Sequence, residues 1–254
     1  FASLRSGAMA GTGTDPRRAL AQLFEAGSAL ERAKPGFVAR PGQREMAVAI
    51  FDALQEPGAR LAVEAGTGTG KTLAYLAAAY FSGKRVALVT GTRALQDQLV
   101  AREAPALGAA VGETVRPAVL KGLTNYVCLR RFDDAAKSDL GSSETFATLQ
   151  TWVKDTASGD VAELSQWRED TPLLRAITSS SDTRLGPPCP FYKSCFVTHA
   201  RREAEEAQLL VVNHHLLLAE VSGLKRHGRS LLGQVDAIIV DEAHRLEGLI
   251  AESG

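Results

Sequence analysis

The sequence predicts an α/β protein built on a doubly wound, mainly parallel β-sheet. Four short segments rich in valine, isoleucine and leucine recur far apart along the chain, as buried parallel strands do. Helical patterns follow the first two, at Lys71–Phe81 and Thr92–Glu103, so strand and helix alternate as in a parallel sheet. The four expected strands are Leu61–Val63, Val86–Thr90, Leu209–Val212 and Ala237–Val240.

Two amphipathic helices are expected before the first strand. Apolar residues recur at helical spacing from Ala19 to Phe24 and again from Met46 to Leu54, just before a Pro-Gly turn. Residues 1–14 contain a Ser-Gly-Ala-Met-Ala stretch and fit a tag remnant or a disordered leader. We therefore expect the folded part to begin near residue 15.

A mostly helical insert is expected to interrupt this sheet domain. Residues 119–206 offer few strand signals and hold all three cysteines of the chain. The sheet domain should therefore comprise residues 15–118 and 207–254, with the insert at 119–206 between its two parts. Three cysteines in a chain of 254 residues do not make a disulfide framework, so metal or cluster ligation is the better hypothesis for them.

Composition excludes a disulfide-stapled mini-protein and a helical membrane protein. A chain of 254 residues with 45% hydrophobic residues can bury a sizeable core. No apolar run reaches the roughly 18 to 20 residues that a membrane helix needs, and no signal-peptide pattern opens the chain, so we expect a cytoplasmic protein with no membrane partner. The 29 basic residues balance the 29 acidic ones, so net charge indicates no particular partner.

A glycine-rich stretch before the helix at Lys71–Phe81 predicts a phosphate-binding loop. It departs from the pattern G-x4-G-K-[ST] only at Ala65, where the pattern has glycine. Backbone N–H groups of such a loop turn toward phosphate oxygens, and the helix N-terminus favours the same anion. Lys71 is expected to reach the β- and γ-phosphates of ATP, and Thr72 to bind Mg²⁺. The expected nucleotide-binding residues are Ala65, Gly66, Thr67, Gly68, Thr69, Gly70, Lys71 and Thr72.

An acidic pair at the end of the last expected strand completes this predicted catalytic set. Asp241 is expected to hold Mg²⁺, directly or through water, and Glu242 to orient and deprotonate the attacking water, with Lys71 as the third catalytic residue. An Asp-Glu pair in this position is also an ordinary helix N-cap. The phosphate loop in the same chain favours the catalytic interpretation.

With these motifs in place, the sequence resembles the superfamily 2 helicases, and among them the DinG and YoaA branch of the iron-sulfur helicases related to XPD. The resemblance covers about residues 20–254 and includes the stretch Val211-Val212-Asn213-His214-His215-Leu216. The matching motifs follow in order: Arg40–Gln43 is similar to the Q-type motif, Glu64–Thr72 to motif I including its alanine, Thr90–Leu99 to motif Ia, and Asp241–His244 to motif II.

The resemblance implies a RecA-like motor domain of an ATP-dependent DNA helicase. Such a motor moves 5′ to 3′ along single-stranded DNA and opens forked DNA in repair, the SOS response or replication, together with proteins that the sequence does not identify. Gln43 would then contact the adenine, Thr90 the DNA backbone, and His244 would couple the state of the nucleotide to DNA contacts. Ordinary structural roles remain the alternative for all three residues.

The resemblance also implies a [4Fe–4S] cluster bound by four cysteines, and here the sequence departs from the family. Cys128, Cys189 and Cys195 match the first, third and fourth positions, but Arg184 stands at the second. A guanidinium cannot replace a thiolate. Either another ligand completes the cluster, or the cluster is absent, or Arg184 is a mutation or sequence error. Zinc held with His199 and buried thiols without metal are the other interpretations.

We expect the insert to lie where the strands of a duplex part. Phe191 and Tyr192 can stack on bases, and Arg201 and Arg202 can contact phosphates, whatever the DNA sequence. The chain ends ten residues after His244, so we expect a fragment that binds nucleotide but is inactive as a helicase alone. A non-catalytic nucleic-acid-binding or redox-sensing module and a P-loop kinase are the alternative functions.

Overall fold

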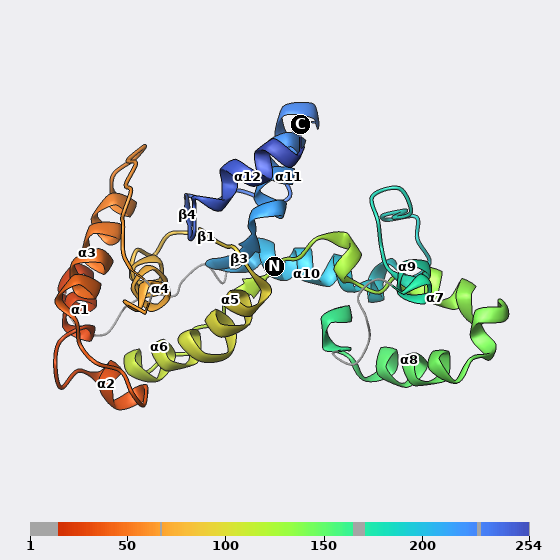
Figure 1. The fold of residues 1–254 in the computed structure, drawn as a ribbon, viewed down its shortest axis with the longest axis horizontal. Helices are drawn as coiled ribbons and strands as arrows, with labels where there is room; N and C mark the ends of the chain where they lie inside the picture. The colour runs from red at the N-terminus through yellow and green to blue at the C-terminus, as the bar shows by residue number, and fades with distance from the viewer. Residues whose placement is uncertain (1–14, 67, 165–170, 228–229, 254) are drawn as a thin grey trace. The chain divides into compact units, whose positions relative to one another are not determined.

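The computed structural model describes residues 15–253 except 67, 165–170 and 228–229, so the expected leader at 1–14 lies outside the described residues. The chain forms two compact units (Figure 1). One contains the described residues up to Ala118 together with those from Ala207 onward, and the other is Val119–Glu206. Among the described residues, no helix is long and apolar enough to cross a membrane.

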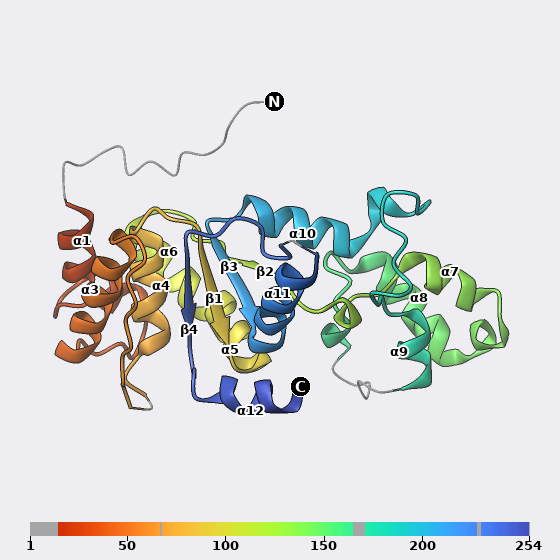
Figure 2. The ribbon, with the colours of Figure 1, turned by 90° about the horizontal axis from the view of Figure 1, so that it is seen from above.

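The first unit is built on a parallel sheet whose strands lie in the order β2-β3-β1-β4 (Figure 2). The central strand β1 pairs in parallel with β3 on one side and with β4 on the other. All five residues of β1 are buried, which explains its continuous run of apolar residues. The predicted doubly wound α/β fold is therefore confirmed. The strands are β1 (Val86–Thr90), β2 (Ala118–Val119), β3 (Leu209–Asn213) and β4 (Ala237–Val240).

Helices cover both faces of this sheet, with α5 on one face and α11 on the other (Figure 1), while α6 packs against α2 and α4. Helix α4 spans Lys71–Phe81 as predicted, and every residue from Leu73 to Ala79 is buried, so α4 is a core helix. A π-helical turn, Leu99–Glu103, joins α5 to α6. The helices are α1 (Pro16–Leu23), α2 (Ala29–Ala33), α3 (Pro41–Gln55), α4 (Lys71–Phe81), α5 (Arg93–Gln98), α6 (Ala104–Val111), α11 (His214–His227) and α12 (Arg245–Ser253).

The expected first strand, Leu61–Val63, is wrong. This segment has no regular structure, and Leu61 and Val63 are 47% and 43% exposed. A strand is stable only when its backbone bonds to a neighbouring strand, and β4, the edge strand, pairs with β1 alone among the described strands. Without such a partner, three apolar residues cannot offset the entropy lost on ordering them.

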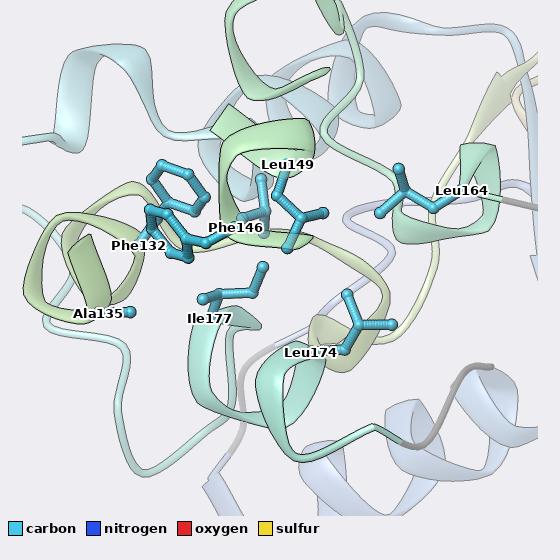
Figure 3. Packing of buried hydrophobic residues seen from close by; sticks show 8 residues of the cluster. Phe132, Ala135, Phe146, Leu149, Leu164, Leu174 and Ile177 are labelled. Atoms are coloured by element: carbon cyan, nitrogen blue, oxygen red, sulfur yellow. The ribbon is translucent and has the colours of Figure 1, made fainter. Parts of the chain in front are cut away.

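The second unit is mostly helical and has a core of its own (Figure 3). The rings of Phe132 and Phe146 stack with centroids 4.7 Å apart, and Leu149 and Ile177 are fully buried beside them. Two isolated antiparallel β-bridges occur among the described residues of this unit. They pair Tyr126 with Asp160 and Val127 with Thr178. Its helices are α7 (Leu129–Ala136), α8 (Glu144–Asp155), α9 (Pro172–Ile177) and α10 (Phe196–Glu206), with short 3₁₀ turns at Leu123–Asn125, Asp139–Ser142, Val161–Glu163 and Tyr192–Ser194.

Candidate nucleotide site

The phosphate loop leads directly into the first turn of α4. Gly68 and Gly70 adopt the left-handed backbone conformation, with φ of 73° and 81°, which allows the tight turn before the helix. The ammonium of Lys71 donates to the carbonyl oxygens of Ala65 at 2.8 Å and of Gly66 at 3.2 Å. The Thr69 hydroxyl also donates to the Gly66 carbonyl, at 2.9 Å. The lysine thus lies within its own loop, where its donors can pass to phosphate oxygens; Thr67 lies outside the described residues.

Two residues at the start of α3 bind this loop by its backbone. Nε2 of Gln43 donates to the carbonyl oxygen of Gly70 at 2.9 Å, and Gln43 is only 5% exposed. The guanidinium of Arg40 donates to the carbonyl oxygen of Gly68. Gln43, expected to contact adenine, therefore supports the phosphate loop with its amide nitrogen.

The carboxylate of Asp241 lies directly after β4 and is held by several donors. Its backbone N–H donates to the Val89 carbonyl at 2.9 Å, which extends the pairing of β4 with β1 by one residue. Oδ1 accepts from the backbone N–H of Glu242 at 2.9 Å, and Oδ2 accepts from the Tyr75 hydroxyl at 3.3 Å. The backbone carbonyl of Asp241 accepts from Nε2 of His214 at 2.8 Å. The acidic pair and helix α4 are therefore in contact.

Tyr75 connects the two halves of the predicted Mg²⁺ site. Its hydroxyl donates to Oδ2 of Asp241 at 3.3 Å and interacts electrostatically with the Thr72 side chain. Burial, followed by the nearby Asp241 carboxylate, raises the pKa of Tyr75 well above its usual value, so the hydroxyl stays protonated and donates. Thr72 and Asp241, the two expected Mg²⁺ ligands, thus share one neighbour.

Glu242 has an unusual backbone and a charged partner. It is the one described non-glycine residue with positive φ, at 52°, a conformation that tends to occur at functional sites. Its Oε2 pairs with the Arg245 guanidinium at 3.1 Å, and both groups lie so close to Gly91 that a β-carbon there would overlap them. Gly91 thereby joins the expected motif Ia to motif II, while His244 next to them is exposed.

Comparison with known proteins shows what this chain is similar to. The model of the DEAD/DEAH box helicase family matches residues 40–142, which include the loop that carries Lys71. This part of the chain is similar to the DEAD/DEAH box helicases. It is 42% identical over 227 residues to the ATP-dependent DNA helicase YoaA of Escherichia coli, a match that covers 88% of this chain and 36% of that protein.

Two further relatives are similar over most of this chain. YoaA of Haemophilus influenzae is 39% identical over 242 residues, covering 94% of this chain and 38% of the relative. The ATP-dependent helicase DinG of Mycobacterium tuberculosis is 35% identical over 242 residues, covering 83% of this chain and 35% of the relative. The chain thus spans about a third of the length of these relatives.

One expected DNA contact has no support in the site. Thr90 at the end of β1 is fully buried, and its hydroxyl donates to the Thr92 carbonyl at 3.5 Å. Its side chain cannot touch DNA in this conformation, because the parallel sheet and the helices that cover it enclose the end of β1. The neighbouring Thr92 is partly exposed, but its hydroxyl caps α5 by accepting from Leu95 N–H.

The three cysteines of the chain come together in the second unit. Cys128, Cys189 and Cys195 line one cavity, and Arg184 lines it as well. The cavity measures about 20 Å³, room for about one water molecule. Nε of Arg184 is buried and has no hydrogen-bond partner among the described residues, while its Nη2 donates to the Thr198 hydroxyl at 3.3 Å.

These residues do not fit a four-cysteine cluster or a zinc site. Within the described part of the chain, no group of three or more histidine, cysteine, aspartate or glutamate side chains is placed to hold a metal ion. Nε2 of His199 is engaged by the Lys193 carbonyl at 2.6 Å, and Arg184 supplies a positive charge where a thiolate is required. The three cysteines predicted to act together thus lie in one cavity, but the side chains around them suit neither an iron-sulfur cluster nor a zinc ion.

The two arginines of α10 differ in their surroundings. Arg201 is partly buried, and burial together with repulsion from the Arg184 guanidinium lowers its pKa. Arg202 is exposed, and its guanidinium lies 4.0 Å from the Glu206 carboxylate. The guanidinium groups of Arg184 and Arg201 form a local positive charge that a phosphate group would relieve.

Sequence reasoning missed Tyr75 and gave no role to His214. Tyr75 is three residues after Thr72, and residues at that spacing share a helix face. The Tyr75 hydroxyl, flanked by leucine and alanine from Leu73 to Ala79, was the available signal, because a buried hydroxyl needs a hydrogen-bond partner.

Proposed function

We propose that the protein is an ATP-dependent DNA helicase and that this chain carries its nucleotide-binding site. The contact of Tyr75 with Asp241 carries the proposal, because it brings the acidic pair of β4 to the helix that begins with Lys71. The two YoaA relatives are named ATP-dependent DNA helicases, which supports DNA as the substrate. Translocation 5′ to 3′ on single-stranded DNA, a role in repair or replication and a cytoplasmic location belong to the same proposal.

Each residue of the proposed site has a defined part. Lys71 would exchange its loop carbonyls for phosphate oxygens and balance their charge. Thr72 and Asp241 offer a hydroxyl and a carboxylate, the oxygen ligands that Mg²⁺ prefers. Mg²⁺, when bound, would neutralise charge that develops on the phosphates. Glu242 would orient and deprotonate the attacking water once its carboxylate leaves Arg245.

The proposal does not rely on an iron-sulfur cluster. The implied [4Fe–4S] group needs four anionic ligands, whereas the cavity holds three cysteines and Arg184. The DNA-binding part of the proposal instead uses α10, where Arg201 and Arg202 would contact phosphates close to Phe191 and Tyr192.

A nucleotide-binding measurement tests the core of the proposal. A fluorescent ATP analogue should bind the chain with an affinity that rises when Mg²⁺ is added. Lys71→Ala should weaken binding strongly, because the charge opposite the phosphates is lost. Lys84→Ala, a lysine just beyond the other end of α4, is the matched control and should bind as the wild type does. Equal affinity of wild type and Lys71→Ala would refute the proposal.

A further inference from the structure

Asp241 is fixed from two sides by buried residues that come from distant parts of the chain. Tyr75 of α4 contacts side-chain atom Oδ2 from one side, at 3.3 Å. His214, the first residue of α11, contacts the backbone carbonyl oxygen at 2.8 Å. Each of these two residues is only 2% exposed. A carboxylate at the end of a strand thus has its orientation set by a core helix and by the turn after β3.

The Tyr75 hydroxyl makes a specific hydrogen bond and does not merely fill space in the core. Helix α4 is otherwise filled by alanine and leucine around this position, and a buried hydroxyl is retained where it has partners. Oδ2 of Asp241 accepts from this hydroxyl and Oδ1 accepts from the Glu242 N–H, so each carboxylate oxygen has one donor. A carboxylate with a donor on each oxygen cannot rotate freely about its terminal bond.

His214 has a defined proton arrangement as well. A backbone carbonyl can only accept, so Nε2 carries the proton that it donates to Asp241. Nδ1 is buried and has no hydrogen-bond partner among the described residues. The carbonyl of Asp241 is therefore the contact that accounts for a histidine in this buried position. The neighbouring His215 is exposed.

We propose that Tyr75 and His214 are positioning residues that hold Asp241 in the orientation needed to bind Mg²⁺ with the nucleotide. This inference rests on the proposed function. Mg²⁺ demands nearly octahedral geometry, so a ligand that swings or shifts loses affinity for the ion. Residues behind a metal ligand commonly change metal affinity by about 10-fold to 100-fold when they are removed.

The test measures the Mg²⁺ concentration that half-saturates Mg²⁺-dependent binding of a fluorescent ATP analogue. Tyr75→Phe removes one oxygen atom, and His214→Gln moves the donor away from the Asp241 carbonyl. Each variant should raise the half-saturating Mg²⁺ concentration by about tenfold, whereas binding of the analogue in EDTA should stay unchanged. A role in packing alone would lower the melting temperature without moving the Mg²⁺ dependence.

Two matched controls come from the same elements. Tyr80→Phe makes the same change on α4, where the Tyr80 hydroxyl bonds Glu113 at 2.5 Å instead of the acidic pair. His215→Gln makes the same change one residue from His214, on the exposed side of α11. Both should keep the wild-type Mg²⁺ dependence. If they change it as much as the Tyr75 and His214 variants do, the inference is wrong.

The outcomes separate this inference from the proposed function. Absence of Mg²⁺-dependent nucleotide binding in the wild type overturns the proposed function and the inference with it. Wild-type binding with an unchanged Mg²⁺ dependence in Tyr75→Phe and His214→Gln overturns the inference alone. Circular dichroism reports whether each variant is folded. Should His214→Gln unfold, Tyr75→Phe decides the matter, since it keeps the ring that fills the core.

Discussion

Nε2 of Gln43 donates a hydrogen bond of 2.9 Å to the carbonyl oxygen of Gly70, the last residue before α4. The two residues lie so close that a β-carbon on Gly70 would overlap the Gln43 amide. The first turn of α3 thus supports the phosphate loop through its backbone. Gln43, which the sequence predicts to contact adenine, therefore also holds the backbone of the phosphate loop in place.

Gly70→Ala should destabilise the first unit more than Gly68→Ala. Both glycines have positive φ, so alanine costs about 1–2 kcal/mol in backbone strain at either position. At Gly70 the new methyl group also displaces the Gln43 amide, whereas nothing lies within 4 Å of a β-carbon at Gly68. Urea unfolding of the two variants measures the difference, and adding Gln43→Ala to Gly70→Ala should recover part of it. Equal loss in both single variants would contradict the overlap.

Periodicity predicted the fold well where burial decides the structure. The helix Lys71–Phe81 and the strand Val86–Thr90 have the predicted bounds, because each is buried along most of its length. The same reasoning failed for Leu61–Val63, since an apolar run does not say whether a strand partner is present. It also merged α5 and the π-helical turn into one helix at Thr92–Glu103, because both share a helical pattern.

The candidate site was predictable where short motifs encode it. Lys71 and Asp241 lie in motifs whose spacing reflects phosphate chemistry, so each is recognisable within a few residues of sequence. The contact of Tyr75 with Asp241 joins positions 166 residues apart, and only the packing of α4 against the end of β4 creates it. The buried position of Thr90 likewise follows from the neighbouring strands and helices and not from its own sequence context.

Arg184→Cys should convert the cysteine-lined cavity into a cluster site. The substitution removes a positive charge and supplies the fourth thiol beside Cys128, Cys189 and Cys195. We expect about four iron atoms and four sulfides per chain after anaerobic reconstitution of the variant, together with broad visible absorption. The wild-type chain treated in the same way should retain far less iron.

Arg184→Ala is the control for this experiment. It removes the same guanidinium, including its bond to the Thr198 hydroxyl, without adding a thiol. Iron bound equally by Arg184→Ala and Arg184→Cys would show that relief of charge matters and not the fourth ligand. A full cluster in the wild-type chain would contradict the misfit of Arg184.

Replacing Arg201 and Arg202 together by alanine should weaken binding of single-stranded DNA. Each arginine that meets a phosphate releases a counterion, so the slope of log affinity against log salt should become shallower by about 0.7 for each phosphate that is no longer bound. Fluorescence anisotropy with a labelled oligonucleotide at several salt concentrations gives both quantities. Lys137→Ala combined with Lys154→Ala, beside α7 and on α8, removes the same charge and should have little effect. Unchanged affinity at low salt after the arginine substitutions rules out α10 as a DNA-binding element.

The stability of the second unit should fall in mild acid because of Glu163. Burial alone would raise the pKa of Glu163, but hydrogen bonds from Ser158, Thr156 and Trp152 outweigh it and lower that pKa below 4.5. A carboxylate with a lowered folded-state pKa stabilises the fold fully above the unfolded-state value, and this stabilisation disappears as the pH falls through the folded-state value. The urea midpoint should therefore decrease as the pH falls below about 4.5, and it should do so less in Glu163→Gln, which has no proton to gain.

Thermal or urea unfolding at pH 7 and near pH 3 measures this acid sensitivity. Glu144→Gln, which removes a carboxylate at the start of α8, is the control. An equally large loss in Glu163→Gln would assign the acid sensitivity to other carboxylates.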